Sequence, residues 1–154
     1  MIVQFVCRGN AFRSIIAEAY MKSLRLPGVN ILSSGTRASF YKESNAENFP
    51  KTLDLLRKHG INQYAKDHYA EDLNQELLDG ADVVIFLNKI AYDEAAELFN
   101  LPEKIYIWDV TDLGEPGRVP EDEQQREAFS EDVYMEIVEN VDSLVNSDEM
   151  QRRQ

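Results

Sequence analysis

Short apolar runs alternate with amphipathic helical segments along this chain. The run at residues 81–87, ADVVIFL, is apolar without a break, which is typical of a strand covered on both faces. Further β-rich runs lie at residues 2–6, 29–33 and 104–110. Because helical segments separate the strands, we expect a parallel sheet with right-handed crossovers and helices on both faces. The pattern predicts a three-layer α/β domain with four strands.

Apolar residues at helical spacing predict the helices. These lie at residues 13–24, from about Pro50 to His59, at 72–79, around 92–99 and at 121–145. The polar stretch TRASFYKESNAENFP, residues 36–50, is predicted to be a loop. A length of 154 residues suits one domain, which we place at residues 1–146, followed by a frayed polar tail at 147–154.

The composition narrows the cellular setting and the partners. No apolar stretch approaches the roughly 20 residues that a membrane span needs, and the opening MIVQFVC is unlike a signal peptide. A single cysteine cannot form an internal disulfide, which favours a reducing cytoplasm. Net charge is −12, from +5 over residues 1–70 and −17 over residues 71–154. This acidic balance argues against a nucleic-acid partner, and the lack of a long apolar stretch predicts no membrane partner.

The only cysteine, Cys7, ends the first strand and stands six residues before Arg13. The intervening Gly9 and Asn10 tolerate positive φ, so the short loop can curl and point its N–H groups at an oxyanion near a helix N-terminus. Arg13 can supply two donors to that anion, and the same field favours the thiolate of Cys7. The segment therefore predicts a site in which a sulfur nucleophile faces a bound phosphoryl group. A buried, inert cysteine is the alternative.

CRGNAFRS resembles the phosphate loop of the low-molecular-weight protein tyrosine phosphatases, whose usual form is C-x-G-N-x-C-R-S. Further stretches resemble that family in order and spacing: SSGT at 33–36, KHGI at 58–61, ADVVIFLN at 81–88 and WDVTD at 108–112. The resemblance implies a sheet order of 2-1-3-4. It implies hydrolysis of phosphotyrosine or other aryl phosphates through phosphocysteine, without a cofactor or a metal.

The resemblance also assigns roles to residues. Cys7 is expected to be the nucleophile, Arg13 the phosphate ligand and Asp112 the proton donor, with Asp109 as the competing acid. Asn10 would hold the loop's shape, and the Ser14 hydroxyl would hydrogen-bond the thiolate. The expected phosphate-binding residues are Arg8, Gly9, Asn10, Ala11, Phe12, Arg13 and Ser14. A proton donor is needed because a phenolate leaving group has a conjugate pKa of about 10.

The chain departs from the family pattern at three positions. Phe12 replaces a second cysteine, so a protective disulfide in the loop is impossible. Ala11 stands where tyrosine phosphatases of the family usually carry Ile and arginine-phosphate members carry Thr. Leu113 replaces the proline that follows the acid. Phe40 and Tyr41 are candidates for the aromatic walls of the substrate cleft, with ordinary packing as the alternative.

Other functions stay open at this point. An arsenate reductase shares this loop but would need an external thiol here. A phosphocarrier subunit would have no use for a leaving-group acid, and a non-catalytic binder is favoured if Ala11 and Phe12 spoil the loop. His59 and His68 lack a metal-ligand spacing. We expect phosphorylated protein or small aryl phosphates as substrates, inhibition by phosphate-like oxyanions, and a monomer or weak dimer.

Overall fold

The computed structural model describes residues 1–67, 70–112, 117 and 119–152. Two residues discussed above, His68 and Leu113, lie outside the described residues. The elements are β1 (Ile2–Cys7), α1 (Arg13–Ser23), β2 (Asn30–Gly35), α2 (Lys42–Lys58), the 3-10 helix η1 (Asn62–Tyr64), α3 (Gln75–Gly80), β3 (Val83–Phe86), α4 (Lys89–Leu98), β4 (Ile105–Ile107), α5 (Glu123–Val145) and α6 (Asp148–Arg152).

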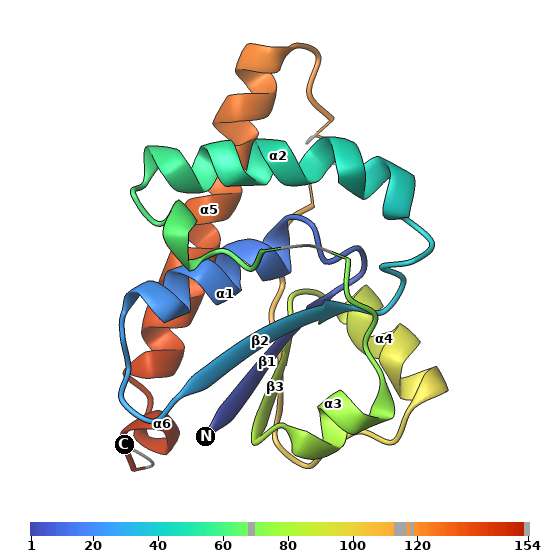
Figure 1. Ribbon diagram of the computed structural model, residues 1–154, viewed down its shortest axis with the longest axis vertical. Coiled ribbons are helices and arrows are strands. Elements are labelled where there is room, and N and C mark those ends of the chain that lie inside the picture. Colours follow the sequence, from blue (N-terminus) through green and yellow to red (C-terminus); the bar gives the residue numbers. More distant parts are fainter. Residues whose placement is uncertain (68–69, 113–116, 118, 153–154) are drawn as a thin grey trace.

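The four strands form one parallel sheet in the order β2-β1-β3-β4, which confirms the expected order and fold class (Figure 1). Cys7 pairs in register with Gly35 at the carboxyl edge of the sheet. The loops that follow β1 and β2 therefore lie next to each other. Ligands of parallel α/β sheets bind beyond this edge.

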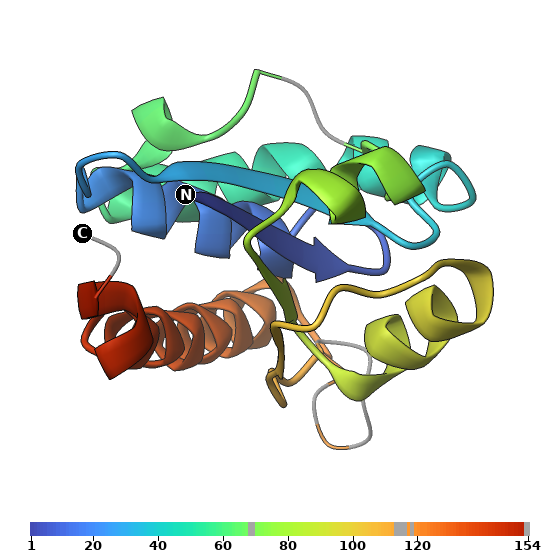
Figure 2. The same cartoon turned by 90° about the horizontal axis from the view of Figure 1, so that it is seen from below.

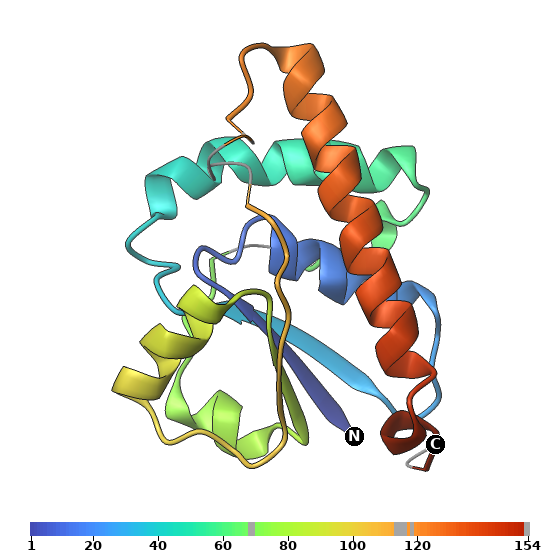
Figure 3. The same cartoon turned by 180° about the vertical axis from the view of Figure 1, so that it is seen from behind.

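The two faces of the sheet bury separate hydrophobic clusters. On one face, Val3, Phe5 and Ile85 pack with α1, α2 and α5. On the other face, Val84 and Phe86 pack with α3 and α4. In Figure 2 the strands β3 and β4 run between α5 and α4, and Figure 3 shows α5 crossing α2 and α1. No helix among the described residues is long and apolar enough to cross a membrane.

Three helices begin at a residue whose side chain accepts a hydrogen bond from the first helical turn. Asn74 accepts from Leu77 at 2.8 Å, and Asn88 accepts from Ala91 at 2.9 Å. Asp122 does the same for Gln125 at the start of α5, at 2.8 Å. Such caps satisfy backbone N–H groups that have no partner within the helix.

Two expectations were wrong. The polar segment predicted as a loop up to Pro50 contains the first half of α2, which begins at Lys42 and keeps Pro50 inside it. Proline removes one helical hydrogen bond, but tertiary contacts of this half, including buried Phe49, offset that loss. The tail predicted to fray instead forms α6, because Met150 is fully buried in the cluster under α5.

Candidate active site

The loop at residues 7–14, here called the Cys7 loop, joins β1 to α1 at the carboxyl edge of the sheet. Asn10 takes a positive φ of 55°, so the loop turns there as the sequence predicts. This conformation aims the Asn10 N–H at the sulfur of Cys7, at 3.2 Å. Only 3% of the surface of Cys7 is exposed, but Cys7 still lines a cavity together with the rest of the Cys7 loop.

A hydrogen-bond chain continues behind the sulfur. The Ser14 hydroxyl lies 3.0 Å from Cys7 Sγ, and the Asn10 amide donates to that hydroxyl at 2.9 Å. The same amide donates to the Ser33 hydroxyl at 3.0 Å, which in turn donates to the buried carboxylate of Glu18 at 2.9 Å. The Asn10 amide thus donates to both hydroxyl groups, and the Ser14 hydroxyl can point its own proton at the sulfur.

Lys66 reaches the same network from the segment after η1. Its ammonium donates to Asn10 Oδ1 at 3.2 Å and to the Ser33 carbonyl at 2.9 Å, and it lies 3.7 Å from the carboxylate of Glu71. The Glu71 N–H also donates to Asn10 Oδ1, at 3.1 Å. Desolvation lowers the pKa of Lys66, against the opposing pull of Glu18 and Glu71. The side chain of Asn10 is therefore held at both ends.

Helix α2 and strand β2 shape the Cys7 loop from outside. Asn45 donates to the Gly9 carbonyl at 2.6 Å, and Thr52 donates to the Ala11 carbonyl at 2.7 Å. These bonds give two loop carbonyl groups a partner and fix the backbone of the Cys7 loop against α2. A Cβ on Gly35 would lie 2.6 Å from the Arg8 carbonyl oxygen, so only glycine permits this close approach.

Arg13 and Asp112 meet over the cavity. The buried Arg13 guanidinium donates to the Val110 carbonyl at 3.1 Å and lies 3.6 Å from the Asp112 carboxylate. Half of the Asp112 side chain is exposed. Asp109 is exposed and does not line the cavity. The two groups expected to bind phosphate and to donate a proton thus lie together with Cys7.

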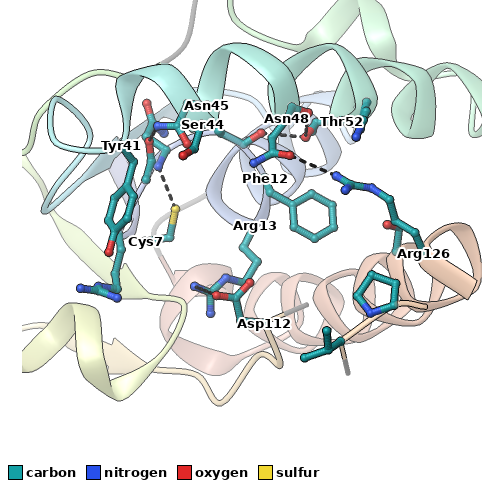
Figure 4. A pocket seen from close by; sticks show the side chains of 18 residues that line it. Cys7, Phe12, Arg13, Tyr41, Ser44, Asn45, Asn48, Thr52, Asp112 and Arg126 are labelled. Carbon is teal, nitrogen blue, oxygen red and sulfur yellow. Dashed lines mark hydrogen bonds and ion pairs between the residues drawn. The ribbon is translucent and has the colours of Figure 1, made fainter. Parts of the chain in front are cut away.

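The cavity encloses about 460 Å³ beside Cys7 (Figure 4). Its lining comes from the Cys7 loop, the first half of α2, the segment after β4 and the start of α5. The described lining residues are Cys7, Arg8, Gly9, Asn10, Ala11, Phe12, Arg13, Tyr41, Ser44, Asn45, Asn48, Lys51, Thr52, Asp112, Val119, Pro120, Arg126 and Ser130. Ser14 lies behind Cys7, fully buried, and contacts the sulfur from there.

The two aromatic candidates for the cleft wall differ. Tyr41 lines the cavity, and the Arg8 guanidinium lies 5.4 Å from its ring centre. Phe40 is 74% exposed and is not a lining residue; it packs edge-on against Tyr41 at 4.9 Å. The expectation that Phe40 forms a wall was therefore wrong, because the backbone turns its ring outward behind Tyr41. Arg8 is held by Glu94 at 2.6 Å.

Several lining residues escaped sequence reasoning. Ser44, Asn45, Asn48 and Lys51 lie on α2, whose first half was predicted to be a loop, and Arg126 and Ser130 lie on α5. Polar residues spaced three and four apart from Ser44 onward were the available signal for one polar helix face. His59 stacks on Tyr134 at 3.8 Å and bonds Glu131, away from this cavity. Within the described residues, no group of three or more potential ligands could hold a metal ion.

Comparison with curated proteins finds a similar enzyme. Over 88 residues, 55% of this chain, the sequence is 36% identical to a protein-arginine-phosphatase of Bacillus subtilis (strain 168). The match spans 54% of that relative, about half of its length.

Solved structures and a family model extend the likeness to nearly the whole chain. A Drosophila arginine phosphatase superposes with a TM-score of 0.73 at 22% identity, covering 96% of this chain and 99% of the other. A low molecular weight protein tyrosine phosphatase from T. tengcongensis superposes with a TM-score of 0.64 at 25% identity, covering 93% and 99%. The family model described as low molecular weight phosphotyrosine protein phosphatase matches residues 2–153. This chain belongs to the low molecular weight phosphotyrosine protein phosphatase family.

Proposed function

We propose that this chain is a cysteine-dependent phosphatase that works through a phosphocysteine intermediate. One observation carries the proposal: the sulfur of Cys7 receives hydrogen bonds at the floor of a cavity that also contains Arg13 and Asp112. A nucleophile, an anion ligand and an acid are the three groups that this chemistry requires. In this proposal Cys7 is the nucleophile, Arg13 binds the phosphate and Asp112 is the proton donor.

In the first step the Cys7 thiolate attacks phosphorus and forms an S–P bond. The oxygen-phosphorus bond of the ester breaks, and Asp112 gives its proton to the departing oxygen. The N–H groups of the Cys7 loop and the Arg13 guanidinium bind the three equatorial oxygens as charge redistributes. The hydrogen bonds from Asn45 and Thr52 to loop carbonyl groups support this, because they fix the conformation of the loop that would bind the oxygens.

In the second step water attacks the phosphocysteine. The Asp112 carboxylate takes a proton from the water, the S–P bond breaks, and the Cys7 thiolate leaves with its electron pair. Ser14 stabilises that thiolate again through the 3.0 Å contact. Inorganic phosphate is released and the starting charges are restored.

Phosphotyrosine is the substrate class that the cavity favours. Tyr41 and Phe12 offer aromatic surface beside the Cys7 loop, which suits a flat phenyl ring. Among the described lining residues the only carboxylate is Asp112, against three cations besides Arg13, namely Arg8, Lys51 and Arg126. A cavity with this charge balance attracts anions more than a guanidinium group.

Phosphoarginine is a second candidate because the Bacillus subtilis relative is named a protein-arginine-phosphatase. Position 11 does not decide between the two, since Ala11 matches neither residue usual at that position. With phosphoarginine, the bond that breaks would be P–N, and Asp112 would give its proton to the departing guanidine nitrogen.

The test compares wild type, Cys7→Ser and Asp112→Asn on phenyl phosphate and on 2,4-dinitrophenyl phosphate, whose leaving group departs without a proton. We expect no turnover for Cys7→Ser. Asp112→Asn should lose about 10²- to 10⁴-fold in kcat on phenyl phosphate and much less on the dinitrophenyl ester. Asp109→Asn is the matched control, since that carboxylate lies outside the cavity, and it should keep wild-type kcat.

Full activity in Cys7→Ser would contradict the proposal. Tight phosphate binding by an inactive wild type would favour a non-catalytic binder instead, and arsenate reduction with an external thiol would favour the reductase. Phosphotyrosine and phosphoarginine peptides of one sequence, assayed side by side, identify the preferred residue by their kcat/KM ratio.

A further inference from the structure

The cavity beside Cys7 has a second end that a phosphoryl group at the Cys7 loop does not occupy. Asn48 and Lys51 from α2 and Arg126 and Ser130 from α5 line it. In Figure 4, Cys7, Arg13 and Asp112 lie to the left of the Phe12 ring and Arg126 to its right, while Asn48 lies above the ring and is joined to Arg126 by a hydrogen bond. At about 460 Å³, the cavity has room for a group well beyond a single phosphate.

Within the part of the chain that the structure describes, Arg126 at this end has a neutral partner in place of an acidic one. The Arg126 guanidinium donates to Asn48 Oδ1 at 3.1 Å, which is a neutral acceptor. No described carboxylate lies within ion-pair distance of Arg126 or Lys51. By contrast Arg8, at the other end, is paired with Glu94 at 2.6 Å. Arg126 and Lys51 line the cavity together, although residues 71–154 carry a net charge of −17.

Asn48 also orients the guanidinium. Because its amide oxygen takes one N–H of Arg126, the planar group is held against α2, and further N–H donors remain for a ligand. A fork of this kind binds carboxylate or phosphate oxygens in pairs, and Lys51 adds a point charge. Ser130 supplies a hydroxyl on the α5 side.

We infer that Arg126, Lys51 and Asn48 form a subsite for a second anionic group on the substrate, and that an apolar spacer between its two anions lies on Phe12. The inference rests on the proposed function, since it takes the Cys7 loop as the phosphoryl end. The substrate class is therefore a phosphate ester that carries another carboxylate or phosphate. An acidic side chain in a phosphopeptide or the second anion of a small aryl phosphate would both satisfy it.

The test uses ligands matched in shape but not in charge. The small pair is 4-(carboxymethyl)phenyl phosphate and its 4-(carbamoylmethyl) amide. The peptide pair carries phosphotyrosine followed by Glu or by Gln. For wild type we expect kcat/KM to be about tenfold higher for the acid than for the amide, as hydrogen bonds to charged groups allow. The preference should shrink as salt concentration rises.

Substitutions test whether the preference for the acid over the amide comes from this subsite. Arg126→Gln and Lys51→Gln should each lower the acid-to-amide ratio about threefold or more, and the double variant should bring it close to one. Arg57→Gln is the matched control, because this exposed cation on α2 pairs with Asp54 and does not line the cavity. It removes the same charge and should keep the wild-type ratio.

The results for the two ligand pairs distinguish the sources of the second anion. A preference in the peptide pair points to acidic phosphopeptides, and one in the small pair alone points to small dianionic esters; both support the subsite. A ratio near one in both pairs for wild type overturns it, as does a loss in Arg57→Gln equal to that in Arg126→Gln. Equilibrium binding of the same ligands to Cys7→Ser separates this from the proposed function. If wild type turns nothing over but Cys7→Ser binds the acids more tightly, and loses that preference with Arg126→Gln, the phosphatase proposal fails and the subsite stands.

Discussion

The Ser14 hydroxyl oxygen lies 3.0 Å from the sulfur of Cys7, and the Asn10 amide donates to that same oxygen. The amide occupies one acceptor site of the hydroxyl, and the hydroxyl can point its own proton at the sulfur. The side chain of Asn10 therefore acts on the sulfur through the Ser14 hydroxyl and does not contact the sulfur directly. The surroundings of the sulfur thus depend on side chains packed behind the Cys7 loop.

Ser14→Ala tests this relationship. A hydrogen bond to a charged group contributes roughly 1.5–3 kcal/mol, so we expect kcat to fall by about 10- to 100-fold. Iodoacetamide should alkylate Cys7 at a lower rate in the variant, because the sulfur loses the hydroxyl group that contacts it and fixes its position. Ser44→Ala, which removes a hydroxyl from the cavity wall on α2, is the comparison. Equal alkylation rates in wild type and Ser14→Ala would contradict this reading.

Gly35, in the SSGT stretch, allows strand β2 to approach the Cys7 loop closely because it has no side chain. A methyl group there would lie 2.6 Å from the Arg8 carbonyl oxygen and 3.0 Å from the Asn10 nitrogen. Both atoms are backbone, so the Cys7 loop must shift. We expect Gly35→Ala to lower kcat/KM at least 100-fold and to destabilise the fold by roughly 1–3 kcal/mol. Gly80→Ala, where a Cβ meets nothing within 4 Å, is the control. Activity close to wild type in Gly35→Ala would show that the loop tolerates the contact.

Much of the fold was predictable because buried strands leave a strong signal. Continuous apolar runs and the helices between them predicted the sheet and placed Cys7 and Asp112 at one edge, where the structure has them. The first half of α2 was not predictable in this way. Its residues are mostly polar. It is stabilised by tertiary contacts, such as the hydrogen bond from Asn45 to the Gly9 carbonyl, which joins segments 36 residues apart. Local periodicity carries no information about such contacts.

The same reason explains what was missed in the site. Arg126 and Asn48 are separated by 78 residues, yet they share a hydrogen bond in the cavity. Phe40 and Tyr41 are neighbours in sequence, and only the observed backbone distinguishes the ring that lines the cavity from the one that faces outward. Met150 gave α6 a buried anchor that a polar tail of eight residues does not reveal.

Lys66 provides a pH-dependent prediction. Burial lowers the pKa of Lys66, so in the alkaline range below pH 10.5 the unfolded chain binds more protons at this position than the folded chain. The free energy of unfolding therefore gains a contribution from Lys66 as pH rises from 8 to 10. Lys66→Met should lack this gain, and it should lower kcat because Asn10 Oδ1 loses a donor.

The measurement is urea unfolding of both proteins at pH 7, 8, 9 and 10. The difference between wild type and Lys66→Met should move in favour of wild type across this series. Lys89→Met, which removes an exposed lysine paired with Asp93 on α4, should run parallel to wild type. Parallel curves for wild type and Lys66→Met would mean that the ammonium is not desolvated.

Tyr20 should make the stability of the fold decrease as pH rises, at pH values above those at which Lys66 acts. Its hydroxyl donates to Asp142 on α5 at 2.7 Å, and desolvation together with this carboxylate raises the pKa of Tyr20 to about 12. In the unfolded chain the hydroxyl loses its proton near pH 10. Between pH 10 and 12 the folded state therefore binds more protons than the unfolded state, and stability falls as pH rises.

Tyr20→Phe removes both the hydrogen bond and the titration. We expect a free energy of unfolding about 1 kcal/mol lower at pH 7, and a shallower decline from pH 10 to 12 than in wild type. Some decline should remain, because burial also raises the pKa of Tyr134, which packs edge-on against Tyr20. Tyr92→Phe, on the opposite face of the sheet against Phe86, should keep the wild-type slope. If Tyr20→Phe declines as steeply as wild type, the link between α1 and α5 does not depend on a protonated Tyr20.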